Sequence, residues 1–133
     1  MATINRFEDL EIWKNARILC KEVRLLILNN DAFSKDFTLR NQLSGSSGSV
    51  MDNIAEGFGR EGNKEFVNFL SFSHGSCNEV KSQLYRAYDF GYLNEKELSN
   101  IFELIERVGS GIKSLMNYLI KSEFKGNKFK RKP

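Results

Sequence analysis

The chain has very little proline, histidine and cysteine, and it contains no long hydrophobic run. Proline occurs once in 133 residues, as Pro133, so no proline interrupts a helix before the end of the sequence. Apolar and polar residues do not alternate as they do in a half-buried strand. No apolar run approaches the ~20 residues needed to cross a bilayer. These absences exclude a transmembrane segment and favour an all-α protein.

Residues that support catalysis or hold metals are equally scarce. His74 is the only histidine, and no cysteines or carboxylates surround it at metal-ligand spacing. A di-iron site in a helical bundle needs Glu-x-x-His motifs on two helices, and nothing favours a serine activated by His74. Gly57, Gly59 and Gly62 match G-x-G-x-x-G, but no βαβ unit surrounds them. The sequence predicts no enzyme activity, catalytic residue, metal site or cofactor.

The two cysteines and the first residues bear on the compartment. Cys20 and Cys77 are far apart and lie on apolar helix faces, which favours reduced, buried thiols over a disulfide. The opening MATINRFEDLEIWK contains no apolar segment typical of a signal peptide. We expect a cytoplasmic protein that does not bind membranes.

The net charge of +3 comes from the last nine residues. Without the five basic residues found there, the chain has a slight acidic excess. We predict a disordered basic tail at residues 125–133, which either only adds solubility or contacts phosphate groups or acidic partners. Its basic residues are Lys125, Lys128, Lys130, Arg131 and Lys132.

Apolar residues repeat at spacings of three and four over four segments. This pattern predicts helices at about residues 9–28, 35–57, 63–91 and 94–120. The predicted helix ends are a break at residues 29–31, an N-cap at Ser34 or Asp36, an N-cap at Asn63, a left-handed Gly91, and a capping box of Asn94 with Glu97. Short connections force neighbouring helices to be antiparallel, so residues 1–124 should form an up-down-up-down four-helix bundle.

The last predicted helix carries a second apolar stripe, formed by Phe102, Gly109 and Met116. A surface wider than one bundle seam is typical of a subunit interface, and equally of a broad core face.

A row of small and polar residues flanks the apolar face of the second helix, from Ser44 to Arg60. If the hairpin turns near Gly62, Ser49 lies opposite Gly75. Glycine inside a helix costs about 1 kcal/mol relative to alanine, so we expect close helix approach at Gly45, Gly48 and Gly75.

Buried carboxylates in this row would need partners. We expect Arg60 or Arg86 to pair with Glu56 and Glu79. The row is either a polar clamp that fixes helix register or a contact for a ligand or nucleic acid. Its residues are Ser49, Asn53, Glu56, Gly57, Arg60, Gly75, Ser76 and Glu79.

Several motifs carry a family resemblance. They are FEDL-x-x-WK from Phe7, NIAEG-x-GR from Asn53, and GS-x-x-E from Gly75. With them, residues 7–120 resemble the four-helix 23S ribosomal RNA intervening-sequence proteins, whose relatives include the accessory variability proteins of diversity-generating retroelements. The resemblance implies a homopentameric ring of bundles without enzymatic activity. For the retroelement relatives it implies binding of nucleic acid and of a reverse transcriptase through a basic surface.

The chain departs from the family pattern at residues 44–48, where the sequence SGSSG replaces the usual basic pair and alanines. This loss moves nucleic-acid binding by the bundle to Arg17, Lys21 and Arg24, together with the tail. We therefore expect a non-enzymatic, oligomeric scaffold that binds RNA or DNA. The alternative is a scaffold that binds only proteins.

Overall fold

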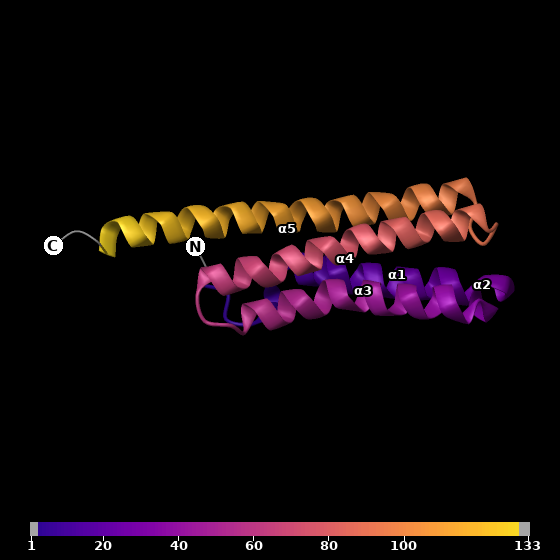
Figure 1. Ribbon diagram of the computed structural model, residues 1–133, viewed down its shortest axis with the longest axis horizontal. Coiled ribbons are helices and arrows are strands. Elements are labelled where there is room, and N and C mark those ends of the chain that lie inside the picture. Colours follow the sequence, from indigo (N-terminus) through magenta and orange to yellow (C-terminus); the bar gives the residue numbers. More distant parts are fainter. Residues whose placement is uncertain (1–2, 131–133) are drawn as a thin grey trace.

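The computed structural model describes the backbone of residues 3–130 and the side chains of residues 3–122. Four long helices lie side by side, and no strand occurs in this part of the chain, which confirms the predicted all-α bundle (Figure 1). In chain order the elements are η1 (Phe7–Asp9), α1 (Glu11–Leu28), α2 (Asp31–Lys35), α3 (Phe37–Phe58), α4 (Asn63–Asp89) and α5 (Glu95–Lys130). The predicted ring of bundles stays a prediction.

The core is built from the predicted apolar stripes. In α1, residues spaced by three and four are buried along one side of the helix, and α5 repeats the pattern. The helices α3 and α4 form the most extensive pair, α5 packs mainly on α4, and α1 covers α3 and α5. Buried stripe residues include Ile12, Ala16, Leu19, Val23 and Ile27 on α1, and Ile101, Ile105, Val108 and Ile112 on α5.

Most predicted helix ends are confirmed. The carboxylate of Asp36 accepts a hydrogen bond of 3.2 Å from the backbone N–H of Leu39, so Asp36 is the N-cap of α3. In the capping box, the Asn94 side chain accepts from the Glu97 N–H at 2.8 Å, and the Glu97 carboxylate accepts from the Asn94 N–H at 3.0 Å. Gly91 has the expected positive φ of 80°.

The predicted N-cap at Asn63 is wrong. The helix α4 already begins at Asn63, and the preceding Gly62 is the capping residue, without a side chain to bond the helix. Gly62 has a φ of 87°, a conformation that glycine adopts without strain, so it turns the chain sharply into α4.

The short helix α2 was not predicted from the sequence. Asn30 caps it by accepting the Phe33 N–H at 2.9 Å, and Phe33 is completely buried. The Phe33 ring stacks on Tyr92 with ring centroids 5.0 Å apart. The Tyr92 hydroxyl donates to Asp36 at 2.8 Å, and this hydrogen bond raises the pKa of Tyr92 above its usual value. These contacts of Phe33, Tyr92 and Asp36, which we call the α2 corner, therefore join the start of α3 to the turn before α5.

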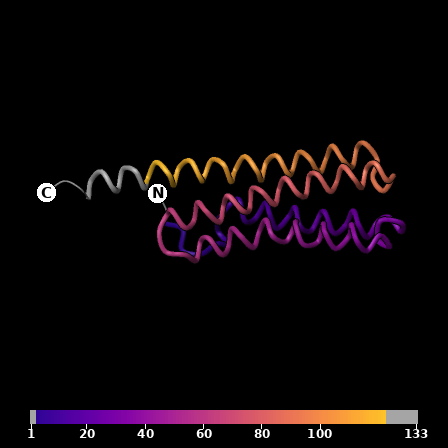
Figure 2. Tube along the Cα trace, viewed as in Figure 1, coloured from indigo at the N-terminus to yellow at the C-terminus, as the bar shows by residue number. Residues whose placement is uncertain are grey.

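The last helix is longer than its neighbours. It has 36 residues, against 27 in α4, and Figure 1 shows it running on beyond the end of the bundle. Figure 2 shows the coloured part of α5 beside α4 along the length of the bundle. The side chains of Lys125, Lys128 and Lys130, and all of Arg131 and Lys132, lie outside the described residues, so the disordered tail stays a prediction.

The second apolar stripe on α5 is mostly part of the core. Gly109 is buried, and Phe102 and Met116 are half-buried against the core cluster. Most of the wide apolar face of α5 therefore packs against the core of the bundle. Its width does not by itself indicate a subunit interface.

Both cysteines are free thiols, but they differ in exposure. Cys77 is buried, whereas Cys20 is half-buried, so the prediction of two buried thiols holds only for Cys77. Burial, together with the negative charge of Glu106, raises the pKa of Cys77 to about 11.

We expect a thiol reagent at pH 8 to label Cys20 and to spare Cys77 until the protein unfolds. With its pKa of about 11, the Cys77 thiol is ionised on the order of once in 1,000 molecules, and the core excludes the reagent. Peptide mass spectrometry after timed labelling, with and without urea, measures the two rates. Equal labelling of both cysteines in the folded protein would contradict the buried position of Cys77.

Candidate functional site

The predicted polar row becomes a hydrogen-bonded seam between α3 and α4. The Ser76 hydroxyl donates to the Ser49 hydroxyl across the two helices at 3.0 Å, and the Asn53 side chain donates to the same oxygen at 2.9 Å. One turn away, the buried Ser73 hydroxyl donates to the Val50 carbonyl at 2.6 Å. The predicted register, with Ser49 opposite Gly75, is thus within one residue of the observed one.

The seam continues toward the start of α3. The Ser46 hydroxyl donates to Gln83, and Arg86 donates to the side-chain oxygen of Gln42 at 2.6 Å. Within the described residues, every buried side-chain nitrogen or oxygen has a hydrogen-bond partner. Since the seam satisfies its own donors and acceptors, its geometry is that of a clamp that fixes the register of α3 against α4.

The two seam carboxylates behave differently. Glu56 pairs with Arg60 at 2.8 Å, as expected, and the Arg60 guanidinium lies 5.1 Å from the centroid of the Phe69 ring. The expectation for Glu79 is wrong, because Arg86 bonds Gln42 instead. Both carboxylates are exposed, so neither is a buried charge that needs a partner. No cation lies within ion-pair distance of Glu79 among the residues whose side chains are described.

The close approach of α3 and α4 occurs at Gly57 and not at the glycines expected from the sequence. A Cβ atom at Gly57 would lie 2.6 Å from the Cβ of Phe69 and 3.0 Å from the Phe66 ring. At Gly75, a Cβ would meet no described atom within 4 Å, and the same is true of the two glycines near the middle of α3. Those positions are Gly45 and Gly48, which point away from the helix contact.

The three predicted cations of α1 line one groove. Arg17, Lys21 and Arg24 are all exposed and follow each other at spacings of four and three, so they share one side of the helix. The groove has a volume of about 420 Å³ and runs between α1 and α3. On the α3 side it is lined by Ser44, Ser47 and Met51. We call this set of residues the basic groove.

Within the part of the chain with described side chains, the three cations of the basic groove form no ion pair. Among residues 3–122, no carboxylate oxygen lies within 4.0 Å of its three cations, although other surface cations form ion pairs. The guanidinium of Arg17 lies 5.7 Å from the centroid of the Trp13 ring, which limits its motion without neutralising it. The groove can therefore attract an anionic ligand along its length.

The sequence missed the contribution of α3 to this groove. The SGSSG segment appeared only as a loss of basic residues, yet its small side chains leave the space beside α1 open. Ser47 is buried and donates to the Leu43 carbonyl at 2.7 Å, whereas Ser44 is exposed at the groove. The spacing of Ser44 and Ser47, three residues apart, was the only sign in the sequence that both lie on one side of α3. Their place in the groove follows from the packing of α1 on α3.

Other chemistry finds little support in the part of the chain with described side chains. His74 is half-buried beside Gly109, and no group of three or more potential metal ligands occurs there. Within the same residues, no helix is long and apolar enough to cross a membrane.

The chain is similar to known proteins both in sequence and in structure. The model of a family described as 23S rRNA-intervening sequence protein matches residues 8–114. A crystal structure of a protein with unknown function from the S23 ribosomal protein family of Bacteroides thetaiotaomicron superposes with a TM-score of 0.71. The two proteins share 18% sequence identity, and the superposition covers 79% of this chain and 97% of the Bacteroides protein. At this identity the likeness shows the fold alone. Among curated proteins, none matches the chain.

Proposed function

Because the chain belongs to the 23S rRNA-intervening sequence protein family, we propose that it is a non-enzymatic, oligomeric scaffold that binds RNA or DNA through the basic groove. The observation that carries the proposal is the alignment of Arg17, Lys21 and Arg24 along one groove, without a described carboxylate partner. Neither the family description nor the structural neighbour supplies an activity for the chain.

The spacing of the cations suits a phosphate backbone. Arg17 and Arg24 are seven residues apart, which is about 10 Å along a helix. One strand of a duplex advances about 3.4 Å per nucleotide, so the span of the three cations corresponds to about three nucleotide steps. Arginine can bind a phosphate with two parallel hydrogen bonds, and lysine adds a point charge between the two arginines. The exposed Ser44 hydroxyl offers one further donor.

The groove contains few groups suited to reading base edges. Its other lining residues are the half-buried Cys20 and Met51 and the buried Val23 and Ser47. Contacts to phosphate position a protein on nucleic acid without selecting sequence. We therefore expect binding with little sequence preference, strengthened when several subunits of one oligomer engage the same strand.

The alternative, a scaffold that binds only proteins, has its own supporting observation. Exposed aromatic side chains gather near the joint between α4 and α5, where Tyr85, Tyr88 and Phe90 are between 38% and 55% exposed. Aromatic residues are enriched in protein interfaces.

Binding of a short oligonucleotide at increasing salt tests the proposal. A fluorescent oligomer of about six nucleotides limits each subunit to one groove, and anisotropy gives its affinity. With three phosphate contacts, log affinity should fall with log salt at a slope of about −2 for a single strand. An unchanged affinity between about 50 and 200 mM salt, or no binding at low salt, would favour the protein-binding alternative.

A further inference from the structure

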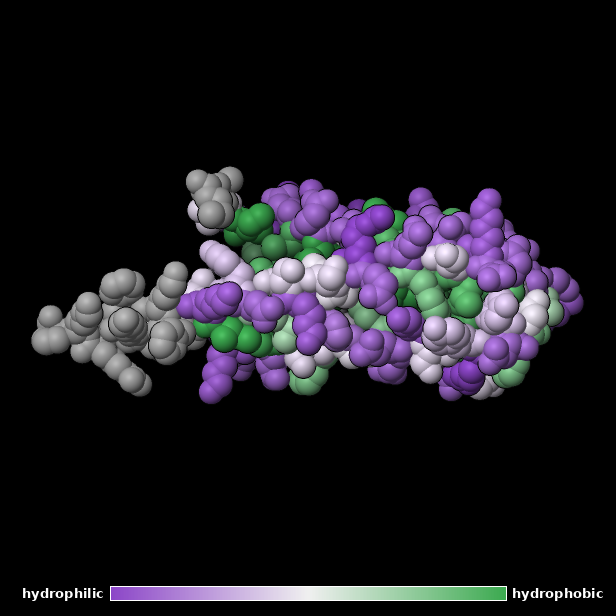
Figure 3. All heavy atoms as spheres, turned by 90° about the horizontal axis from the view of Figure 1, so that it is seen from above, coloured by the Kyte–Doolittle hydropathy of each residue, from purple (hydrophilic) through white to green (hydrophobic). Residues whose placement is uncertain are grey.

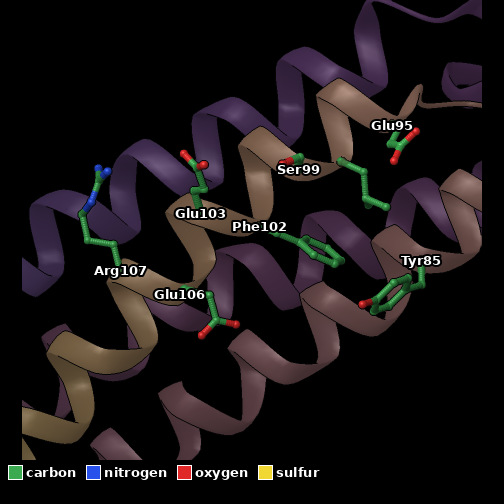
Figure 4. Close-up of a pocket in the computed structure, with 8 residues that line it drawn as sticks. Tyr85, Glu95, Ser99, Phe102, Glu103, Glu106 and Arg107 are labelled. Carbon is green, nitrogen blue, oxygen red and sulfur yellow. The ribbon is translucent and has the colours of Figure 1, made fainter.

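A second charged surface lies between α4 and α5, away from the basic groove. It is an open hollow of about 700 Å³ with an aromatic floor and acidic edges (Figure 4). Figure 4 shows Phe102 and Tyr85 pointing toward one another, with Glu106 on the same side and Glu103 on the opposite side of α5. We call it the acidic–aromatic surface, formed by Tyr85, Glu95, Phe102, Glu103 and Glu106.

The aromatic floor is accessible. The rings of Tyr85 and Phe102 meet edge to face with centroids 4.8 Å apart, and 49% of Tyr85 remains exposed. Figure 3 looks onto the side of the molecule that α5 forms, where hydrophobic side chains remain visible between hydrophilic ones. An apolar floor of this kind can receive an apolar or aromatic side chain from another molecule.

This surface already holds one cation of its own chain. The Lys81 ammonium lies 2.8 Å from Glu106 and 5.4 Å from the centroid of the Phe102 ring. The hydrogen bond from Lys81 keeps the pKa of Glu106 below its usual value, so this carboxylate stays ionised. The geometry thus combines carboxylate pairing with cation–π contact, the two interactions that suit lysine and arginine.

Further carboxylates near this surface are unpaired. Among residues 3–122, no cation lies within ion-pair distance of Glu95 or Glu103. Glu103 also lines a neighbouring groove between α1 and α5, where Glu22 and Glu97 add negative charge. Arg107 is the cation that lines both hollows, and Figure 4 shows it on the side of α5 away from Tyr85.

The complementary segment is the C-terminal arm, which we define as residues 118–133. At its start, Tyr118 and Ile120 are 59% and 52% exposed. Residues 125–133, with the sequence KGNKFKRKP, contain five basic residues, one phenylalanine and no acidic residue. The match of the family model ends at residue 114, so the arm lies beyond it. The arm therefore offers apolar side chains that suit the aromatic floor and positive charges that suit the carboxylates of the acidic–aromatic surface.

The arm cannot reach the surface of its own chain. Phe102 and Tyr118 lie on the same continuous helix α5. Their separation of 16 residues is about 24 Å along the helix axis, and the arm continues away from Phe102. The surface can therefore receive this arm only from another copy of the chain.

We propose that the C-terminal arm of one copy docks on the acidic–aromatic surface of the next copy. The proposal rests on the oligomer proposed above and names the contact that builds it. Each copy contributes one arm and one surface from opposite ends of α5, so the interface is head-to-tail. Such an interface closes into a ring when the rotation between neighbours permits, and otherwise extends as a filament.

A charge exchange in the full-length protein tests the contact. One variant carries Glu95→Lys and Glu103→Lys, a second carries Lys128→Glu and Lys130→Glu, and a third combines all four substitutions. Each of the first two places like charges opposite each other and should raise the protein concentration at half-dissociation at least about tenfold, because like charges facing each other disfavour association. The third should restore the oligomer. Sedimentation and light scattering give the mass.

The control is Asp52→Lys, which reverses a single charge at an exposed position of α3. It should leave the oligomer mass unchanged, and circular dichroism should show equal helix content in all variants. An oligomer that resists both double substitutions would overturn the arm contact alone. A monomeric parent protein at micromolar concentration would overturn the proposed oligomer as well.

Discussion

Leucine in place of Gly57 is expected to lower the free energy of unfolding by about 1–3 kcal/mol through overpacking. The new Cβ would lie 2.6 Å from the Cβ of Phe69, and that atom cannot move without shifting the backbone of α4. The Phe66 carbonyl oxygen, at 3.4 Å, closes the same space from the side. Urea unfolding followed by circular dichroism measures the change.

The matched control is leucine in place of Gly75. Gly75 lies in the middle of α4, where leucine gains about 0.5–1 kcal/mol of helix propensity. Gly57 is the second-last residue of α3, so the gain there is smaller. A Cβ at Gly75 meets no described atom within 4 Å, so this variant should be as stable as the parent or slightly more stable. Equal losses at both positions would show that the helices do not approach as described. A lower oligomer mass for the Gly75 variant, at unchanged stability, would place this surface in a subunit interface.

The contrast between these glycines shows what a sequence pattern can tell. Gly57 follows Val50 and Ile54 at spacings of four and three, so it continues the buried row of α3. Gly45 and Gly48 belong to a different row on the same helix. The cost of glycine in a helix suggested close approach at Gly45, Gly48 and Gly75, whereas the helical period could have selected Gly57.

The fold was largely predictable because it depends on local rules. Stripes of apolar residues gave the long helices, and side-chain donors and acceptors such as Asp36 and Asn94 gave two of the helix starts. The short helix α2 could not be predicted, because it is stabilised by the packing of Phe33 on Tyr92, a residue far away in the sequence. Five residues are too few to show helical periodicity, so tertiary contact decides this element.

Of the two walls of the basic groove, only the one formed by α1 was predictable from the sequence. The spacing of Arg17, Lys21 and Arg24 indicated a basic row on α1. The partner wall depends on which helix packs beside α1, and the sequence does not give that neighbour directly. The acidic–aromatic surface was missed for the same reason, because it joins side chains of α4 and α5 that are separate in sequence.

Neutralising the basic groove is expected to have the largest effect on function. The triple variant Arg17→Gln, Lys21→Gln, Arg24→Gln should bind the short oligonucleotide on the order of 100-fold more weakly at about 50 mM salt. The reason is that three phosphate contacts and their released counterions are lost together. The salt slope should approach zero, whereas loss of one contact would change it by less than one unit. The fold should persist, because the three side chains are exposed and have no described ion-pair partner.

The matched control for this variant removes the same charge elsewhere. Lys64, Lys96 and Lys113 are exposed, lie outside the groove, and can be changed to glutamine together. If binding depends on the groove, the control should retain most of the affinity and most of the salt slope. Equal losses in both triple variants would mean that net charge alone attracts the nucleic acid. Full binding by the groove variant, combined with loss of binding when residues 125–133 are deleted, would place the phosphate contacts in the tail.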